Sequence, residues 1–180
     1  MLTSDIDKIV FELKTNNVVS IPTDTVYGLS CNISKDAVAK VINLKKRDSS
    51  KGFIIISHDF NHLVQYVDIT KLSDMQINKL CSKQQQPITW IAPAKKDIQW
   101  LTGGKPTVAL RLVNTDIIKD ICSKLNNAII STSANISGQE FINNPIIVNK
   151  IFKDIYVLET QVNSSQPSKI IDIITGKQVR

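Results

Sequence analysis

Two short segments combine hydroxyl and amide side chains with a glycine, and such groups bind phosphate or carboxylate oxygens. The first, 21–29 (IPTDTVYGL), leaves an apolar strand, turns through two threonines and resumes at an aromatic residue and a glycine. The second, 131–138 (STSANISG), carries three hydroxyls and Asn135 into a loop that ends in a glycine. Each has a structural alternative: a capped turn for the first segment and a capped helix start for the second.

Basic side chains are in excess and partly clustered. The chain has 22 lysines and arginines against 16 aspartates and glutamates, giving a formal charge of +6 and a pI of about 9.2. Four basic residues fall close together: Lys45, Lys46, Arg47 and Lys51. The excess favours anionic partners such as nucleotides, phosphates or RNA without choosing among them. The alternative for the cluster is a solvated helix end, because basic residues stabilise a helix C-terminus.

The common nucleotide-binding and hydrolase motifs are absent. The six glycines form neither G-x-x-x-x-G-K-[ST] nor G-x-G-x-x-G, and no G-x-S-x-G occurs, which excludes P-loop, Rossmann and hydrolase-elbow motifs. The three cysteines are far apart and predict free thiols. His58 and His62 are four residues apart, but Asp59 would cap the helix and leave His58 outside it. We therefore expect a solvated histidine pair and no metal site.

Alternating helical and strand patterns must position these side chains. The spacing predicts helices over 4–15 (capped by Thr3 or Ser4), 35–47, 59–66 and 72–81, and one from a cap at 114 or 115 to 125. Strands are expected over 18–21, 52–57, 87–92, 107–113, 128–131, 155–158, 169–174 and 178–179. This order predicts an α/β fold with a mixed sheet. No linker divides the chain, so residues 1–180 are expected to form one domain.

Length and composition are those of an ordinary globular protein. The chain has 180 residues, of which 42% are apolar and 21% charged, with a mean hydropathy of −0.03. The longest apolar runs are strand-sized, far below the roughly 18 residues that span a bilayer. The N-terminal segment lacks the order of a signal peptide. We expect a cytoplasmic protein with no membrane partner.

Seven short sequence blocks, each present once, follow one another along the chain. They are PTDTVYGL (22–29), KKR followed by KGFIII (45–56), PITWIAPA (87–94), WLTGG (100–104), TVALRL (107–112), STSANISG (131–138) and PSKIID (167–172). In this order they resemble the threonylcarbamoyl-AMP synthase family, the YrdC/Sua5 proteins, in its short bacterial form. The chain departs where many relatives have Trp-Pro-Gly before the fourth strand and this one has Gln84, Gln85 and Gln86, and Arg180 is its last residue.

The resemblance implies both a fold and a reaction. The fold is a twisted sheet of parallel and antiparallel strands flanked by helices, with a basic concave cleft. The reaction is that of a nucleotidyltransferase, which converts L-threonine, bicarbonate and ATP into threonylcarbamoyl-AMP and pyrophosphate. It is the first step of threonylcarbamoyladenosine formation at position 37 of tRNA, and transferase machinery downstream would use the product. Because no covalent enzyme nucleophile is needed, the protein must position substrates and stabilise charge.

The resemblance also implies which residues act. The ATP-binding residues would be Lys45, Lys46, Arg47, Lys51, Ser133, Asn135 and Arg180. The threonine-binding residues would be Thr23, Thr25, Arg111, Ser131 and Ser168. Arg47 and Lys51 would be catalytic, because arginine grips phosphate through two hydrogen bonds and lysine supplies a mobile point charge. Mg²⁺ is expected with ATP, with most of its ligands coming from phosphates and water.

Arg111 gives a prediction that rests on strand geometry. In the apolar run 107–113 it should share a face with Ala109 and Val113. A buried guanidinium needs an internal acid or a ligand carboxylate, since leaving it unpaired is costly. Because the resemblance puts threonine at this site, the ligand is favoured.

Two other functions remain open from the sequence. The high pI is compatible with a module that binds double-stranded RNA or tRNA without catalysis, and weak tRNA binding could also accompany the enzyme. A non-catalytic nucleotide sensor is the third possibility. Pyrophosphate release that depends on threonine would separate the enzyme from both alternatives.

Overall fold

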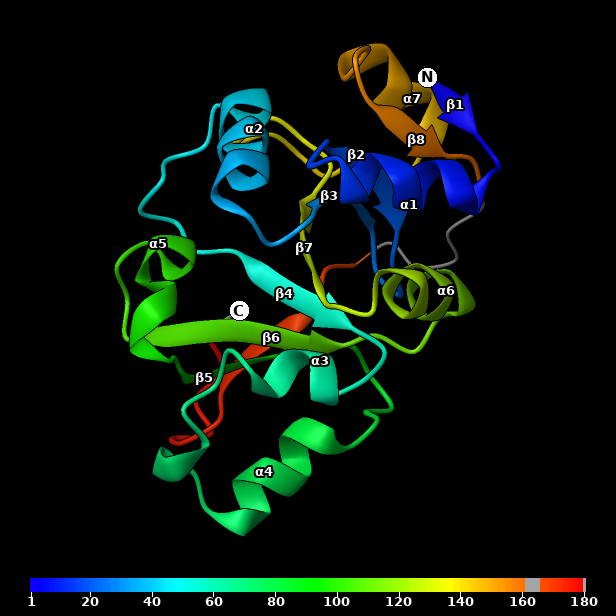
Figure 1. Ribbon diagram of the computed structural model, residues 1–180. Coiled ribbons are helices and arrows are strands. Elements are labelled where there is room, and N and C mark those ends of the chain that lie inside the picture. Colours follow the sequence, from blue (N-terminus) through cyan, green and yellow to red (C-terminus); the bar gives the residue numbers. More distant parts are fainter. Residues whose placement is uncertain (161–165, 180) are drawn as a thin grey trace.

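One nine-stranded sheet organises the computed structural model, which describes residues 1–160 and 166–179 (Figure 1). Its strands are β1 (Leu2–Thr3), β2 (Val19–Pro22), β3 (Tyr27–Cys31), β4 (Ile54–Ser57), β5 (Ile88–Pro93), β6 (Thr107–Leu112), β7 (Ile129–Ser133), β8 (Tyr156–Leu158) and β9 (Lys169–Asp172). The α-helices are α1 (Ile6–Lys14), α2 (Lys35–Lys45), α3 (Asn61–Val64), α4 (Asp74–Cys81), α5 (Gln99–Thr102), α6 (Asp116–Leu125) and α7 (Pro145–Ile151). The expected α/β class is confirmed.

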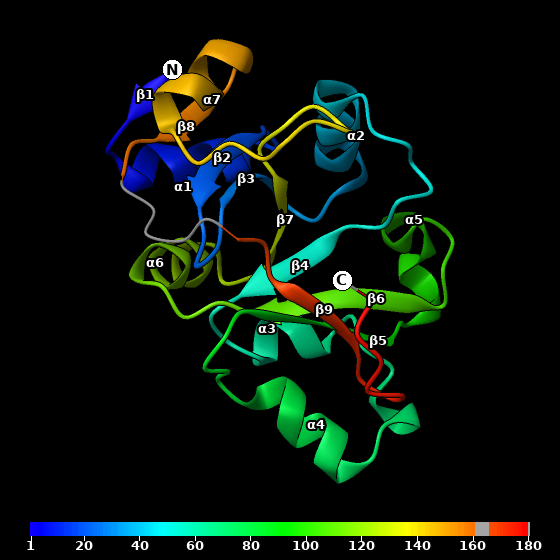
Figure 2. The same cartoon turned by 180° about the vertical axis from the view of Figure 1, so that it is seen from behind.

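The strand order is β1-β8-β2-β3-β7-β4-β6-β5-β9. β1 and β2 pair with β8 in parallel, as do β4 with β6 and β5 with β9, while the other neighbours are antiparallel. The expected mixed sheet is therefore present. Seen from behind, β9 lies along β5 at the edge of the sheet, and the chain after β9 folds back so that Gln178 bridges to Ile171 of that strand (Figure 2).

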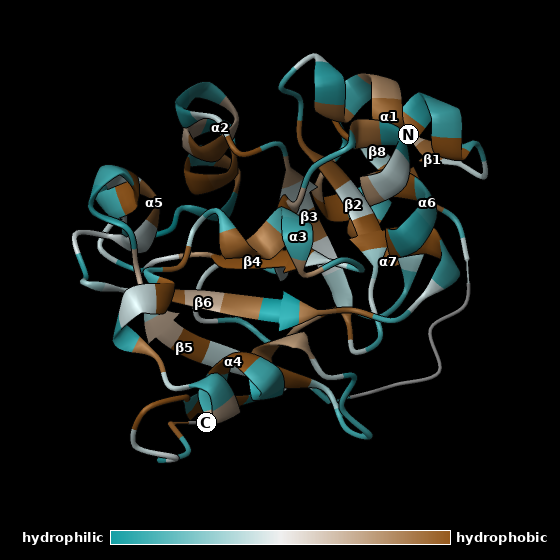
Figure 3. Ribbon diagram, turned by 60° about the horizontal axis from the view of Figure 1, so that its bottom comes forward, coloured by the Kyte–Doolittle hydropathy of each residue, from teal (hydrophilic) through white to brown (hydrophobic). Residues whose placement is uncertain are grey.

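Both faces of the sheet are covered, so its central strands are apolar on both sides. On β4, Ile55 packs into the core that includes α2, whereas Ile56 packs into the core formed with α1 and α6. Hydrophobic colouring is accordingly concentrated in the strands and on the helix turns that face them (Figure 3). The continuous apolar run at 52–57 predicted this double burial, since adjacent strand residues point to opposite faces.

The start of α1 differs from the sequence expectation of a cap at Thr3 or Ser4. Asp5 is the cap, and its carboxylate accepts hydrogen bonds from the backbone N–H groups of Asp7 (2.8 Å) and Lys8 (3.2 Å). Thr3 Oγ1 instead accepts from the N–H of Asp5 (3.1 Å). The carboxylate satisfies two otherwise unpaired amides and carries the charge that a helix N-terminus favours.

Other expected elements lie close to their predicted positions. Ser34 caps α2, Ser73 caps α4 and Thr115 caps α6. The expected strand at 178–179 is reduced to one bridge, between Gln178 and Ile171. Helices α5 and α7 and strand β1 were not expected from the sequence pattern.

The elements around the centre of the sheet bring the two hydroxyl-rich segments together. β3 and β7 pair so that Gly28 lies opposite Ser133, and β4 and β6 pair so that Ile56 lies opposite Arg111. The segment 131–138 continues β7 into a loop, so the alternative of a capped helix start at this place is wrong.

Candidate active site

A cavity of about 410 Å³ lies among residues of β3, β4, β5, β6, β7 and β9. Eight of the residues expected from the sequence line it: Thr23, Thr25, Arg47, Arg111, Ser131, Ser133, Asn135 and Ser168. Its volume falls within the range of small-molecule sites, which is about 300–1,000 Å³. The two hydroxyl-rich segments and the strand that carries Arg111 therefore face one space.

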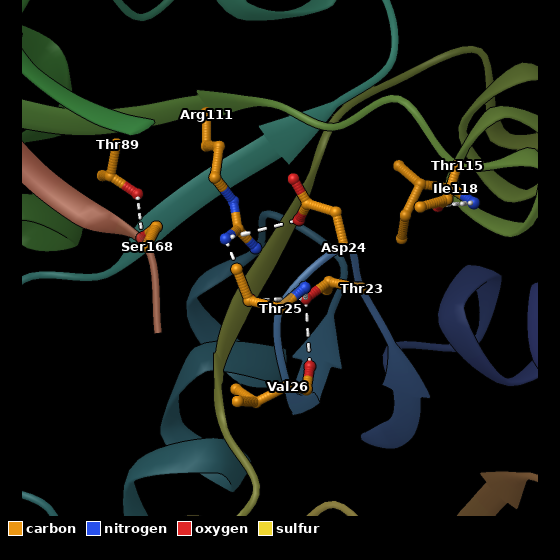
Figure 4. A network of polar contacts seen from close by, with 9 residues as sticks. All are labelled: Thr23, Asp24, Thr25, Val26, Thr89, Arg111, Thr115, Ile118 and Ser168. Atoms are coloured by element: carbon orange, nitrogen blue, oxygen red, sulfur yellow. Dashed lines mark hydrogen bonds and ion pairs between the residues drawn. The ribbon is translucent and has the colours of Figure 1, made fainter. Parts of the chain in front are cut away.

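Arg111 is a buried cation at the edge of this cavity. Its side chain leaves β6 and points toward the turn between β2 and β3, where Nη1 donates to Thr25 Oγ1 (3.0 Å) and lies 3.4 Å from Asp24 Oδ1 (Figure 4). The residue is only 5% exposed. Ala109 lines the same cavity, which confirms that the two residues share a face of β6. A guanidinium in this setting can pair with the carboxylate of a small ligand through two hydrogen bonds.

The turn at Thr23 and Thr25 is held by its own hydroxyls. The two Oγ1 atoms lie 2.9 Å apart, and Thr23 Oγ1 also donates to the carbonyl of Val26 (3.0 Å). The N–H of Thr25 donates to Thr23 Oγ1 (3.2 Å). The turn interpretation of this segment and the binding interpretation are therefore compatible, since the same bonds fix Thr25 against Arg111.

The close approach of β3 and β7 requires a glycine. A Cβ atom added to Gly28 would lie 2.2 Å from Ser131 Oγ and 3.2 Å from the carbonyl oxygen of Thr132. Any side chain at this position would displace the hydroxyl of Ser131 from the cavity wall.

Ser168 is tied to the sheet by a residue that the sequence did not single out. Thr89 is completely buried on β5, and its Oγ1 lies 2.8 Å from Ser168 Oγ (Figure 4). A threonine inside an apolar strand was the available signal. Gln139, Glu140 and Phe141 were also missed and line the cavity from the loop after β7.

The loop after β7 is built around a buried lysine. Lys45 Nζ donates to the carbonyl oxygens of Ser133 (2.5 Å) and Asn135 (2.6 Å) and to Asn135 Oδ1 (3.0 Å). Ser133 Oγ donates to the same amide oxygen (2.6 Å). Burial, followed by the charge of Arg47, lowers the pKa of Lys45 to about 8. Three residues expected to contact ATP thus contact one another.

The remaining basic residues of the cluster differ in position. Arg47 lines the cavity, donates from Nη2 to the carbonyl of Gly52 (2.9 Å) and stacks on Phe53, with 5.1 Å from its Cζ to the ring centroid. Burial lowers its pKa. Lys46 and Lys51 are exposed and are not part of the cavity wall in the described structure. Arg180 lies outside the described residues.

Residues 1–160 and 166–179 contain neither a metal-binding cluster nor a membrane-spanning helix. No group of three or more histidine, cysteine, aspartate or glutamate side chains there could hold a metal ion. Contrary to the expectation of a solvated pair, His58 and His62 are half-buried, and His62 Nδ1 lies 2.9 Å from Ser57 Oγ. None of the helices in the described part combines the length and apolar character needed to cross a bilayer.

Sequence comparison with known proteins identifies the family of this chain. The Sua5/YciO/YrdC family, described as telomere recombination, matches residues 12–180. A threonylcarbamoyl-AMP synthase of Wigglesworthia glossinidia brevipalpis is 40% identical over 177 residues, which cover 96% of this chain and 91% of that protein. The protein of the same name from Histophilus somni (strain 2336) is 37% identical over 180 residues, 98% of each chain.

Solved structures share the fold. P. abyssi Sua5, determined as a complex with L-threonine, has a TM-score of 0.83 and 25% identity, covering 93% of this chain and 50% of that one. E. coli YciO has a TM-score of 0.77 at 18% identity, covering 99% and 94%, which shows the fold alone. Since the family pattern and the curated relatives match almost from end to end, this chain belongs to the Sua5/YciO/YrdC family.

Proposed function

We propose that the chain is a threonylcarbamoyl-AMP synthase, which forms threonylcarbamoyl-AMP and pyrophosphate from L-threonine, bicarbonate and ATP. The observation that carries the proposal is Arg111, a buried cation that lines the cavity beside the hydroxyl of Thr25. This pair suits the carboxylate of an amino acid. Support comes from the curated relatives named as synthases and from the relative solved with L-threonine.

In this reaction the main task of the protein is to position the reactants. The threonine nitrogen bonds to the carbon of bicarbonate with loss of water, and the resulting carbamate oxygen attacks the α-phosphorus of ATP. The bond from that phosphorus to the bridging oxygen breaks, and pyrophosphate leaves. In our proposal Arg111, Thr25 and Thr23 hold threonine together with Ser131 and Ser168, while Arg47 and Lys51 stabilise the phosphate charge.

The nucleotide is proposed to enter as its Mg²⁺ complex. Mg²⁺ prefers oxygen ligands and keeps several waters, so phosphates and water would supply most of its coordination. Glu140 lines the cavity and is available as a further carboxylate, whereas Asp24 is engaged by Arg111. Downstream, the mixed anhydride product requires an enzyme that transfers its threonylcarbamoyl group to tRNA.

Pyrophosphate release from ATP tests the proposal. Release should require L-threonine and bicarbonate together, and omitting either should remove it. D-threonine serves as a matched control, because when its carboxylate and amine occupy the positions of the L-isomer, its side chain points where the L-isomer has its α-hydrogen. ATP turnover that is unchanged without threonine, or no turnover by a folded sample, would contradict the assignment.

The RNA-binding alternative is not favoured by relatives that are named as synthases. A salt titration separates the two functions. Binding to the phosphate backbone falls steeply with salt concentration, whereas threonine-dependent pyrophosphate release should persist at moderate ionic strength.

A further inference from the structure

Lys45 is bound so completely that it has no donor left for a substrate. It is 1% exposed, and its three ammonium contacts all go to oxygens of Ser133 and Asn135. An ammonium group has three hydrogens, so these bonds use its full capacity. The residue is also not part of the cavity wall. Its charge is therefore directed at the protein rather than at the cavity.

The contacts of Lys45 continue through the loop that follows β7. Asn135 Nδ2 donates to the carbonyl oxygens of Ile136 (3.1 Å) and Gln139 (2.5 Å). The carbonyl of Lys45 itself accepts from the N–H of Ser137 (3.1 Å). Side chain and backbone of one residue at the end of α2 thus contact the loop at Ser133, Asn135 and Ser137. Figures 1 and 2 show this yellow segment passing beside α2.

The loop held in this way forms one wall of the cavity. Ser133, Asn135 and Gln139 all line it, and Arg47, two residues after Lys45, lines it as well. A shift of the loop would therefore move the wall on which nucleotide contacts are proposed. Arg111 and Thr25, which also line the cavity, make no hydrogen bond with Lys45 within the described residues.

Burying an ammonium group away from water reduces the free energy of unfolding, and an apolar residue at position 45 would avoid this loss. We propose that Lys45 is a positioning residue: its buried ammonium fixes the loop 133–139 in the geometry that receives ATP, without touching the nucleotide. This inference rests on the proposed function and concerns only the binding of ATP. Lys45 would act on ATP binding through the loop, where the family resemblance implied a direct contact.

The test compares Lys45→Met with Lys40→Met, an exposed lysine on the same helix. Lys45→Met keeps the length of the side chain and removes all three donors. We expect the KM for ATP to rise by about 100-fold, the scale of a 1 Å misplacement, with the KM for threonine within about twofold. Hydrogen exchange of the ATP-free protein should be faster in peptides covering 134–139, and Lys40→Met should leave all three quantities unchanged.

The outcomes separate the possible roles. Equal increases in both KM values would show a general loss of structure and overturn the inference. A raised KM for ATP with unchanged exchange in the free loop would mean direct contact and would also overturn it. If the wild-type protein releases no pyrophosphate, the proposed function fails instead, while the exchange measurement still tests whether Lys45 orders the loop.

A measurement on the wild-type protein covers the case in which Lys45→Met does not fold. If Lys45 already fixes the loop, peptides covering 134–139 should be protected from exchange before ATP is added. Addition of ATP with Mg²⁺ should then change their exchange by less than about twofold. A loop that becomes protected only with ATP would overturn the inference.

Discussion

Two buried cations, Arg111 on β6 and Lys45 at the end of α2, are held in different ways. Arg111 contacts a hydroxyl and a carboxylate and lines the cavity, whereas Lys45 donates to three uncharged oxygens and does not line it. Burial therefore does not by itself identify a binding residue. The direction of the donors does, because only a cation that faces the cavity can pair with a ligand.

The difference also follows the chemistry of the two side chains. A guanidinium has five N–H donors in a plane, and Arg111 directs them to a hydroxyl and a carboxylate, Thr25 and Asp24. An ammonium has three, and at Lys45 the loop takes all of them. We thus propose that Arg111 binds threonine by direct contact, whereas Lys45 affects ATP binding by positioning the loop 133–139.

Replacing Arg111 should give the largest effect. Arg111→Lys keeps the charge but loses the two parallel hydrogen bonds to a carboxylate, so we expect kcat/KM for threonine to fall by about 100-fold. The KM for ATP, measured in the same pyrophosphate assay, should change by less than about threefold. If both KM values rise together, the proposed division between threonine binding and ATP binding is wrong.

Gly28→Ala tests the threonine site through packing. The added methyl group would meet Ser131 Oγ at 2.2 Å, so the hydroxyl should turn away, threonine affinity should fall, and unfolding free energy should drop by about 1–3 kcal/mol. In a Ser131→Ala background the same change should cost little further affinity, since the clashing oxygen is gone. Additive losses in this double-mutant cycle would argue against displacement of Ser131.

Thr25→Val should have a smaller effect, because it removes the hydrogen bond from Arg111 and the hydroxyl contact with Thr23 without changing the shape of the side chain. We expect the KM for threonine to rise by about 10-fold, the scale of one hydrogen bond to a charged group. Thr25→Ser keeps the hydroxyl and is the matched control, with an expected change below about twofold. Equal losses in the two variants would mean that the methyl group matters and the hydroxyl does not.

The smallest effect is a pH dependence that belongs to Lys45. Burial lowers its pKa to about 8 from an ordinary 10.5, so between these values the unfolded chain binds more protons than the folded one. Free energy of unfolding therefore rises with pH in this window, and the destabilisation is fully present below pH 8. The free energy of unfolding of the wild type, measured with urea and compared with that of Lys45→Met, should rise by about 1 kcal/mol from pH 8 to pH 10. A constant difference would show that Lys45 keeps its proton throughout.

The central elements of the fold were predictable because their patterns are local. The doubly apolar run at 52–57 and the caps at Ser34 and Thr115 carry their own signals. Strand β1 has only two residues, and α7 exposes several isoleucines, so neither shows a periodicity that a sequence pattern can detect. Pairing with β8, and the cap at Asn144, decide these elements instead.

The sequence alone determined the family, through blocks of fixed order, and it placed Thr25, Ser131 and Arg111 on one site. It could do so because the blocks that carry the resemblance contain these three residues, and the resemblance assigns all of them to one threonine pocket. Only the tertiary structure decided what Lys45 does, because its contacts with Ser133 and Asn135 join positions 88 and 90 residues apart. A basic cluster in sequence gives the number of charges but not their direction, which depends on how α2 packs against the end of β7.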